Sequence, residues 1–299
     1  MEALLRAELF GRDQFAKFAR SLACEHEIDP APGAELLLSR LAENKMVIRE
    51  AHRLVSRALE NKRQLAPAAE WLLDNYYVIE EQILLAGQYL PKRYSRQLPR
   101  LKTGKHVGYP RVYDLAFELV SHTDGRIDVD NLSHFIGMYQ TVQHLSLGEL
   151  WAMPIMLRLA LIENLRRVSH RIALRRLDRD SAIEWAERFL AVASNDSKGL
   201  ITELADFVRV SPRLSHPFIA ELTMRIHGQH LSLGLVINWL ERQLSEDGQT
   251  LEQILQTESQ EQAMDQVSIG SSITSLRALG KTDWKPFIEA QSATEKELK

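Results

Sequence analysis

Three acidic side chains are spaced for chemistry on one helix face. Glu70, Asp74 and Glu81 lie within about 40° of one another on a helix of 3.6 residues per turn. Carboxylates placed in this way can form an acid–base pair or hold a cation. Such a stripe is more commonly a solvated face, and a polar contact with a neighbouring domain is a further alternative. We therefore expect solvation or interdomain contact rather than catalysis.

A run of arginines offers a second kind of chemistry. Between residues 158 and 176 the sequence contains Arg158, Arg166, Arg167, Arg171, Arg175 and Arg176. They would make a local positive surface able to bind anionic headgroups or nucleotide phosphate, unless carboxylates neutralise them. Salt bridges and a solvated face are the simpler interpretation.

Two histidines, His227 and His230, are three residues apart and could share a helix face. They do not predict a metal site, because no third ligand is near and Gly228 between them weakens a helix. The sequence also has no glycine-rich phosphate loop and no nucleophile elbow. We expect no metal, no cofactor and no catalytic residue in this segment.

The composition is that of a folded protein without a dominant charge. Of its 299 residues 45% are hydrophobic, enough for one substantial core or two smaller helical subdomains. Lysine and arginine total 37 against 40 acidic residues, so no overall positive field favours nucleic acid. The single cysteine, Cys24, excludes an intramolecular disulfide. The longest apolar stretch, residues 150–162, is interrupted by Pro154 and Arg158 and is shorter than the ~20 residues of a membrane span.

Helical periodicity runs through nearly the whole sequence, and no convincing alternation of apolar and polar residues indicates a strand. The predicted fold is all-α, a multi-helix bundle or irregular helical array without a significant β-sheet. One helix is expected over residues 34–61, and its core-facing side carries Leu37, Leu41, Ile48, Val55 and Leu59. A second should open at Pro67 and end before Pro91. Its apolar stripe carries Leu72, Tyr76, Ile79 and Ile83.

Residues 91–110 hold three prolines and two glycines, which predicts a long connection. A helix should then open at Tyr109–Pro110 and reach about His122, closed by a turn at Asp124–Gly125. The apolar side of the next helix carries Leu132, Phe135, Ile136 and Tyr139.

The clearest helix start is the capping box formed by Ser146 and Glu149. A long helix should follow to about Asp178, with a kink or a short preceding turn at Pro154. Beyond residues 194–196 the periodicity weakens, and short helices are expected to begin at Ser211–Pro212, Ser232, Thr250 and Ser268. The pentapeptide HLSLG, at residues 144–148 and 230–234, is interpreted as two similar helix starts.

Burial is expected for three tryptophans, because Trp71, Trp151 and Trp239 each lie in an apolar helical stripe. Another capping box over Ser292–Glu295 predicts a helix that starts where the chain stops. Its packing partner should lie downstream, so Ile288 and Leu298 are expected to be more exposed here than in the intact protein. Adding downstream residues should then lower hydrogen exchange after about residue 283.

Five long blocks of sequence form a further pattern that runs from one end of the chain to the other. They are RAELFG at residues 6–11, PAAEWLLDNYYVIEEQI at 67–83, GYPRVYDLAFELVSHTD at 108–124, LSLGELWAMPIMLRLALIENLRR at 145–167, and VSIGSSITSLRALGKTDW at 267–284. Together and in this order, they resemble the amino-terminal region that precedes the glycosyltransferase domain in bacterial cyclic β-1,2-glucan synthases.

The resemblance implies that the chain is part of a large inner-membrane enzyme. In that family a membrane-embedded glycosyltransferase builds the glucan from UDP-glucose, and a phosphorylase-like domain trims it. The implied partners are these downstream domains of the same polypeptide and β-1,2-glucan itself. The implied location is the cytoplasmic face of the inner membrane, with this segment soluble. The family's transferase signatures have no counterpart here, so the segment alone is expected to be inactive towards UDP-glucose.

Some residues in the matching blocks are not required by helix formation alone. Besides Glu70, Asp74 and Glu81, these are Asn75, Arg111, Tyr113, Glu163 and Asn164. They are expected to fix packing between helices or to contact other domains or the emerging glucan, and a tyrosine acting as glucan acceptor is a less favoured alternative.

The expected organisation is a helical domain over residues 1–178, a smaller and less well matched helical subdomain over 179–266, and a connector over 267–299 towards the transferase region. The predicted function is that of a non-catalytic scaffold or regulatory domain of a cyclic β-1,2-glucan synthase. A free-standing helical interaction module is the alternative.

Overall fold

The structure is a computed structural model that describes residues 10–29, 31, 34–90, 94–195, 197–246 and 248–292. Within these residues it is almost entirely helical, which confirms the all-α prediction. The chain forms two compact units. Unit 1 comprises Met1–Arg53, Glu70–Ser169 and Gln266–Lys299, and unit 2 comprises Leu54–Ala69 and His170–Asp265.

Unit 1 begins with α1 (Arg12–Glu25), β1 (Ile28–Asp29) and most of α2 (Leu37–Glu60). It continues through the end of α3 (Pro67–Asp74), α4 (Tyr76–Tyr89), α5 (Tyr94–Gln97), β2 (Arg100–Leu101), α6 (Arg111–His122) and α7 (Val129–Gln140). The first part of α8 (Leu147–Asn195), the last part of α12 (Leu251–Leu279) and α13 (Lys285–Gln291) complete it.

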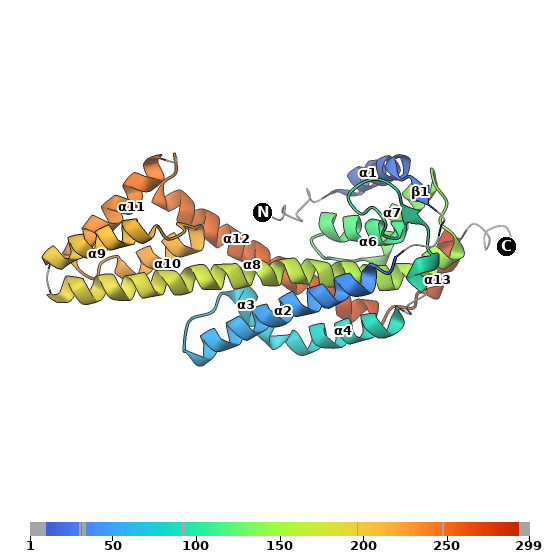
Figure 1. The fold of residues 1–299 in the computed structure, drawn as a ribbon. Coiled ribbons are helices and arrows are strands. Elements are labelled where there is room, and N and C mark those ends of the chain that lie inside the picture. The colour runs from blue at the N-terminus through green and yellow to red at the C-terminus, as the bar shows by residue number, and fades with distance from the viewer. Residues whose placement is uncertain are drawn as a thin grey trace. The chain divides into compact units, whose positions relative to one another are not determined.

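The core of unit 1 is built around α6 and α8. In α6 all residues except Glu118 are buried, and residues 155–166 of α8 are buried without exception. A helix that is buried on all sides must carry its polar groups into the core, where each requires a partner. Helix α1 packs against α7 (Figure 1), where the rings of Phe15 and Phe135 lie 5.9 Å apart.

Unit 2 gathers four short elements beside the second part of α8 (Figure 1). They are α9 (Ser197–Val210), α10 (His216–Ile226), the 3₁₀ helix η1 (Leu231–Leu233) and α11 (Gly234–Glu246). Their apolar sides form a cluster centred on aromatic rings. It contains Trp185, Phe189, Phe207 and Phe218, with Trp239 packed against it.

Two of the three predicted capping boxes are present. Ahead of α8, the Ser146 amide donates to Glu149 Oε2 at 2.8 Å, and the Glu149 amide donates to Ser146 Oγ. Ahead of α12, the Thr250 amide donates to Gln253 Oε1 at 2.9 Å, and the Gln253 amide donates to Thr250 Oγ1 at 3.2 Å. These reciprocal bonds satisfy amides that the first helical turn leaves free.

The helix expected from Pro67 to before Pro91 is broken at Asn75 into α3 and α4. The Asn75 side chain donates to the carbonyl of Trp71 at 3.0 Å, beside the bond that the Asn75 amide makes to the same carbonyl at 3.2 Å. In α2 the predicted core side is correct as far as Val55, but Leu59 is 56% exposed. In the last turn of α2 the smaller Ala58 is buried instead.

Two helices run further than predicted. Helix α8 continues through Pro154 and past Asp178 to Asn195. Helix α12 continues through Ser268, so no helix begins there. The helix expected at Ser211–Pro212 begins at His216, because Ser215 supplies the cap by accepting from the Phe218 amide.

The burial prediction was wrong for Trp151, which is 53% exposed, and Ile288, expected to be more exposed here than in the intact protein, is 2% exposed. Trp71, at 37% exposed, and Trp239 are mostly or partly buried. Ile288 is covered because α13 packs against α7 within unit 1. Leu298 and the capping box at residues 292–295 fall wholly or partly outside the described residues, as do Pro91 and most of the first block at residues 6–11.

A small sheet lies where only a connection was expected. The two-residue strands β1 and β2 pair antiparallel, with Ile28 opposite Leu101. This sheet ties the segment after α1 to the segment ahead of α6, without changing the helical class of the fold.

Candidate functional site

Glu163 on α8 is the centre of a buried charge cluster in unit 1. Its side chain is 1% exposed and accepts from Arg40 Nη2 at 2.6 Å and Arg40 Nε at 2.8 Å. Arg166 donates at 2.9 Å and Arg167 at 3.3 Å. Burial alone would raise the pKa of this carboxyl, but the hydrogen bond from Arg40 and the charge of Arg166 lower it to about 2. Glu163 therefore fixes α2 against α8 as a carboxylate.

The neighbouring residue, Asn164, makes a second contact between helices. Its Nδ2 donates to Ser272 Oγ at 3.0 Å and lies 3.2 Å from Ser268 Oγ, both on α12. The serines that suggested a helix start thus form a buried polar face of α12. Tyr113 on α6 is also buried, and burial together with the charge of Glu163 raises its pKa.

Arg111, at the start of α6, is held in an equally specific arrangement. Its guanidinium group forms two bonds to Glu149, from Nε at 2.6 Å and from Nη2 at 2.9 Å. Nη2 also donates to the carbonyl of His144 at 2.7 Å. Because Glu149 completes the capping box as well, one buried carboxylate connects α6 to the start of α8.

A network around Asp114 was not predicted from the sequence. Asp114 Oδ2 lies 3.1 Å from His26 Nε2, and Oδ1 contacts His106 Nδ1. His26 Nδ1 in turn lies 2.9 Å from the Tyr139 hydroxyl. Burial alone would raise the pKa of Asp114, but the hydrogen bonds with His106 and His26 lower it to about 2. His26 and His106 lie 88 and 8 residues from Asp114 along the chain, so residue spacing did not predict these contacts.

The three acidic residues on α3 and α4 do not form one stripe. Glu70, Asp74 and Glu81 are all exposed, and the break at Asn75 ends the continuous helix from which their common face was inferred. Asn75 uses its Oδ1 to accept from Arg277 Nη2 of α12 at 2.9 Å. Of the residues expected to contact other domains, these three acids alone present their side chains fully to solvent.

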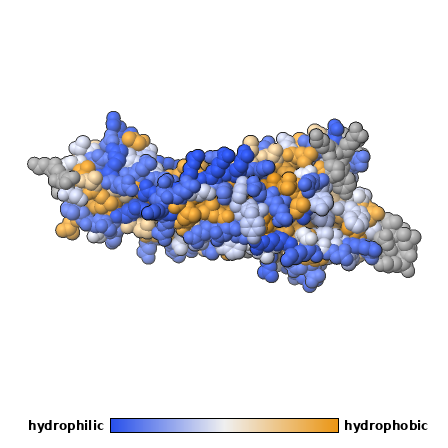
Figure 2. Space-filling model, turned by 90° about the horizontal axis from the view of Figure 1, so that it is seen from below, coloured by the Kyte–Doolittle hydropathy of each residue, from blue (hydrophilic) through white to orange (hydrophobic). Residues whose placement is uncertain are grey.

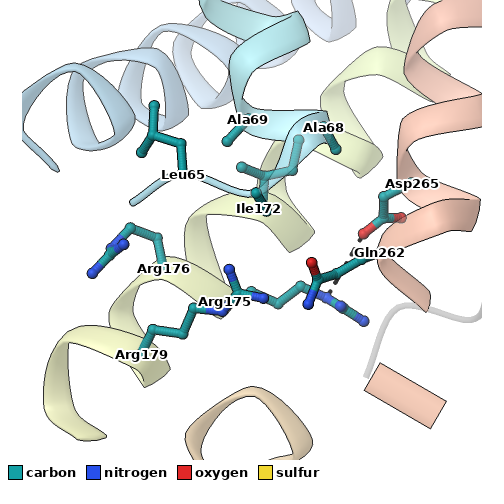
Figure 3. A pocket seen from close by; sticks show the side chains of 10 residues that line it. Leu65, Ala68, Ala69, Ile172, Arg175, Arg176, Arg179, Gln262 and Asp265 are labelled. Carbon is teal, nitrogen blue, oxygen red and sulfur yellow. Dashed lines mark ion pairs between the residues drawn. The ribbon is translucent and has the colours of Figure 1, made fainter. Parts of the chain in front are cut away.

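Three arginines of α8 in unit 2 are neutralised by acids of α12. Arg171 donates to Asp265 at 2.7 Å, and Arg175 donates to Glu258 at 3.1 Å. Arg179 also donates to Glu258, at 2.8 Å. Figure 3 shows Arg175, Arg176 and Arg179 at a small cavity that Leu65, Ala68 and Ala69 line from the other side. Salt bridging, rather than an open positive surface, therefore accounts for this part of the run.

Arg158 is the exception among the arginines of α8. It is 9% exposed, and its one hydrogen bond within the described part of the chain runs from Nε to Gln82 Oε1, at 3.0 Å. No carboxylate among the described residues pairs with it, and burial lowers the pKa of its guanidinium group. A buried charge without a counter-ion is costly and therefore uncommon.

Arg158 lines an open pocket of unit 1 with a volume of 580 Å³. Its walls come from α4, α8 and the segment between α12 and α13. They carry Tyr89, Trp151, Pro154, Ile155, Leu279, Gly280, Thr282 and Trp284. Tyr89 is 64% exposed, and Trp151 is exposed because it faces this space rather than the core. We call this site the aromatic pocket.

Exposed hydrophobic side chains also occur elsewhere on the surface. Figure 2 shows one face on which hydrophobic patches are separated by hydrophilic side chains. A larger open pocket of 780 Å³ lies in unit 2, between the segment ahead of α3, α10 and α12. His227 lines it, but His230 does not, so the two histidines singled out by spacing do not share this site.

Two comparisons bear on what the chain is. No protein-family model matches it. It is 34% identical over 261 residues to the cyclic beta-(1,2)-glucan synthase NdvB of Rhizobium meliloti (strain 1021). The chain matches a segment of that synthase. The aligned region covers 87% of this chain and 9% of NdvB, so the chain spans a small part of its relative's length.

The match to NdvB confirms the resemblance identified from the five sequence blocks. Within the described part of the chain, no helix combines the length and apolar character that a membrane span requires.

Proposed function

We propose that this chain is a non-catalytic helical segment of a cyclic β-1,2-glucan synthase polypeptide and that it acts there as a scaffold or regulatory domain. The observation that carries the proposal is the match to NdvB along 87% of the chain. Its enzymatic partners are domains of the same polypeptide: a glycosyltransferase that builds the glucan from UDP-glucose, and a phosphorylase-like domain that trims it. The segment acts at the cytoplasmic face of the inner membrane.

The geometry of unit 1 supports a scaffold. The polar residues of the matching blocks use their charges and amides inside the unit, where Arg111 binds Glu149, Arg40 binds Glu163, and Asn164 binds Ser272. Bonds of this kind hold helices in a fixed register. Exposed Glu70, Asp74 and Glu81 remain available for polar contact with another domain.

The test uses full-length NdvB in three forms: intact, with the matching segment deleted, and with that segment replaced by this chain. Glucan formed from UDP-glucose is measured at equal amounts of membrane-inserted protein. We expect the deletion to abolish synthesis and the replacement to restore it. This chain alone should give no turnover above a blank.

Two results would overturn the proposal. Turnover of UDP-glucose by this chain alone would make it catalytic. Full synthesis by the deletion form would show that the segment is dispensable and would favour a free-standing interaction module.

A further inference from the structure

The aromatic pocket combines two kinds of surface, aromatic rings and hydrogen-bond donors. Tyr89 and Trp151 present broad aromatic faces to solvent, and Trp284 adds a third ring. Arg158 lines the same pocket and supplies hydrogen-bond donors. The volume of 580 Å³ lies within the range of about 300–1,000 Å³ that is usual for small-molecule sites.

Two features fix the position of the tryptophan rings at the pocket. Leu150 and Ala152 on either side of Trp151 are 0% exposed, so the backbone of α8 is fixed while the indole faces outward. The Trp284 Nε1 donates to the carbonyl of Leu279 at 3.3 Å, which orients that ring at the edge of the pocket. The pocket is therefore largely preformed.

Arg158 indicates which ligand chemistry suits the pocket. Its Nε donates to Gln82, but no acid among the described residues compensates its charge. The other buried arginines of α8, Arg166 and Arg176, each pair with a carboxylate. A ligand rich in acceptor oxygens would satisfy the two terminal amino groups of Arg158.

We propose that the aromatic pocket binds a segment of β-1,2-linked glucan. Glucose rings have apolar C–H faces, which stack on Trp151 and Tyr89, and hydroxyl edges, which accept hydrogen bonds from Arg158. The inference rests on the proposed function, because that function supplies the glucan. It extends that function by giving the scaffold a binding site for the glucan product.

The test titrates this chain with a linear β-1,2-linked glucose pentasaccharide and follows tryptophan fluorescence and calorimetric heat. Saturable binding is expected, and Trp151→Ala and Tyr89→Ala should each weaken it about tenfold or more. Tyr77→Ala is the matched control, because Tyr77 is 66% exposed on the same helix as Tyr89 but does not line the pocket. It should bind like the unchanged chain.

Arg158→Met separates binding from folding. Removing a buried charge that has no counter-ion should leave the melting temperature unchanged or raise it, while glucan binding falls. A fall in both quantities would make Arg158 a structural residue and would contradict the role assigned to it.

Absence of saturable binding, or equal binding by Trp151→Ala, Tyr89→Ala and the unchanged chain, would overturn the proposal. The chain is also titrated with inorganic phosphate and with UDP-glucose, to test whether the pocket binds an anion instead. Saturation of this site by either one without glucan binding would also overturn the proposal. These outcomes leave the segment-replacement experiment unaffected, so a scaffold that does not bind glucan is distinguishable from a segment with no role in synthesis.

Discussion

Single residues show how this chain keeps charges in its interior. Glu163 and Glu149 are almost inaccessible to water, yet each is surrounded by guanidinium, amide or hydroxyl donors from other parts of unit 1. A buried ion pair contributes little net stability over an apolar pair of the same shape, but breaking one leaves an uncompensated charge. These residues therefore specify how the helices of unit 1 meet.

Asp114 gives the fold a defined sensitivity to acid. Its pKa of about 2 in the folded chain is below the usual 3.8, so its ionised form stabilises the fold above pH ~4. This contribution, about 2 kcal/mol, should be lost as the pH falls from about 4 to about 2. In urea unfolding, the stability difference between the unchanged chain and Asp114→Asn should shrink over that range. Asp13→Asn, at an exposed position of α1, serves as control. A difference independent of pH would contradict this account.

At the scale of elements, side chains rather than helix propensity set where helices end. Asn75 lies between α3 and α4 and caps the Trp71 carbonyl with its side chain, and Ser215 starts α10 four residues after Ser211, where a Ser-Pro pair looked like a start. The turn between α6 and α7 depends on Gly125, which has a φ of 76°. At that angle a side chain is strained, and α12 passes close by.

Gly125→Ala should destabilise unit 1 for two reasons. A Cβ there would clash with Ser272 Oγ and lie 3.3 Å from Ser272 Cα, and the left-handed backbone costs about 1–2 kcal/mol for alanine. Gly104→Ala is the matched control, because Gly104 has a φ of 88° and nothing within 4 Å of the added atom. Thermal unfolding should show a larger loss for Gly125→Ala. Equal losses would mean that the contact with Ser272 is unimportant.

At the scale of the whole molecule, the chain divides its apolar residues between two units. Helices α8 and α12 each contribute to both, whereas the aromatic cluster around Phe207 belongs to unit 2 alone. Phe207 is 0% exposed, and its ring lies 4.9 Å from that of Trp185 and 5.4 Å from that of Trp239. Unit 2 therefore has a core of its own.

Phe207→Ala should destabilise unit 2 by about 3–5 kcal/mol, because it leaves a cavity among packed rings. Hydrogen exchange should accelerate across residues 200–244 while amides of α6 in unit 1 keep their protection. Val208→Ala, at a neighbouring position that is 44% exposed, should change stability by less than about 0.5 kcal/mol. Equal acceleration in both units would show that they open together.

The sequence by itself determined the helical class, the core side of α2 up to Val55, and the capping boxes of α8 and α12, because periodicity and capping depend on residues within a few turns of one another. It also determined the relationship to a glucan synthase, through blocks of matching residues. Tertiary structure decided that Asp114 meets His26, that Ile288 is covered, and that the serines of α12 face Asn164. It also decided that Trp151 and Arg158, two residues of one apolar stretch, line a pocket instead of the core. Such features depend on which distant segments pack together, and spacing along a single chain does not specify that.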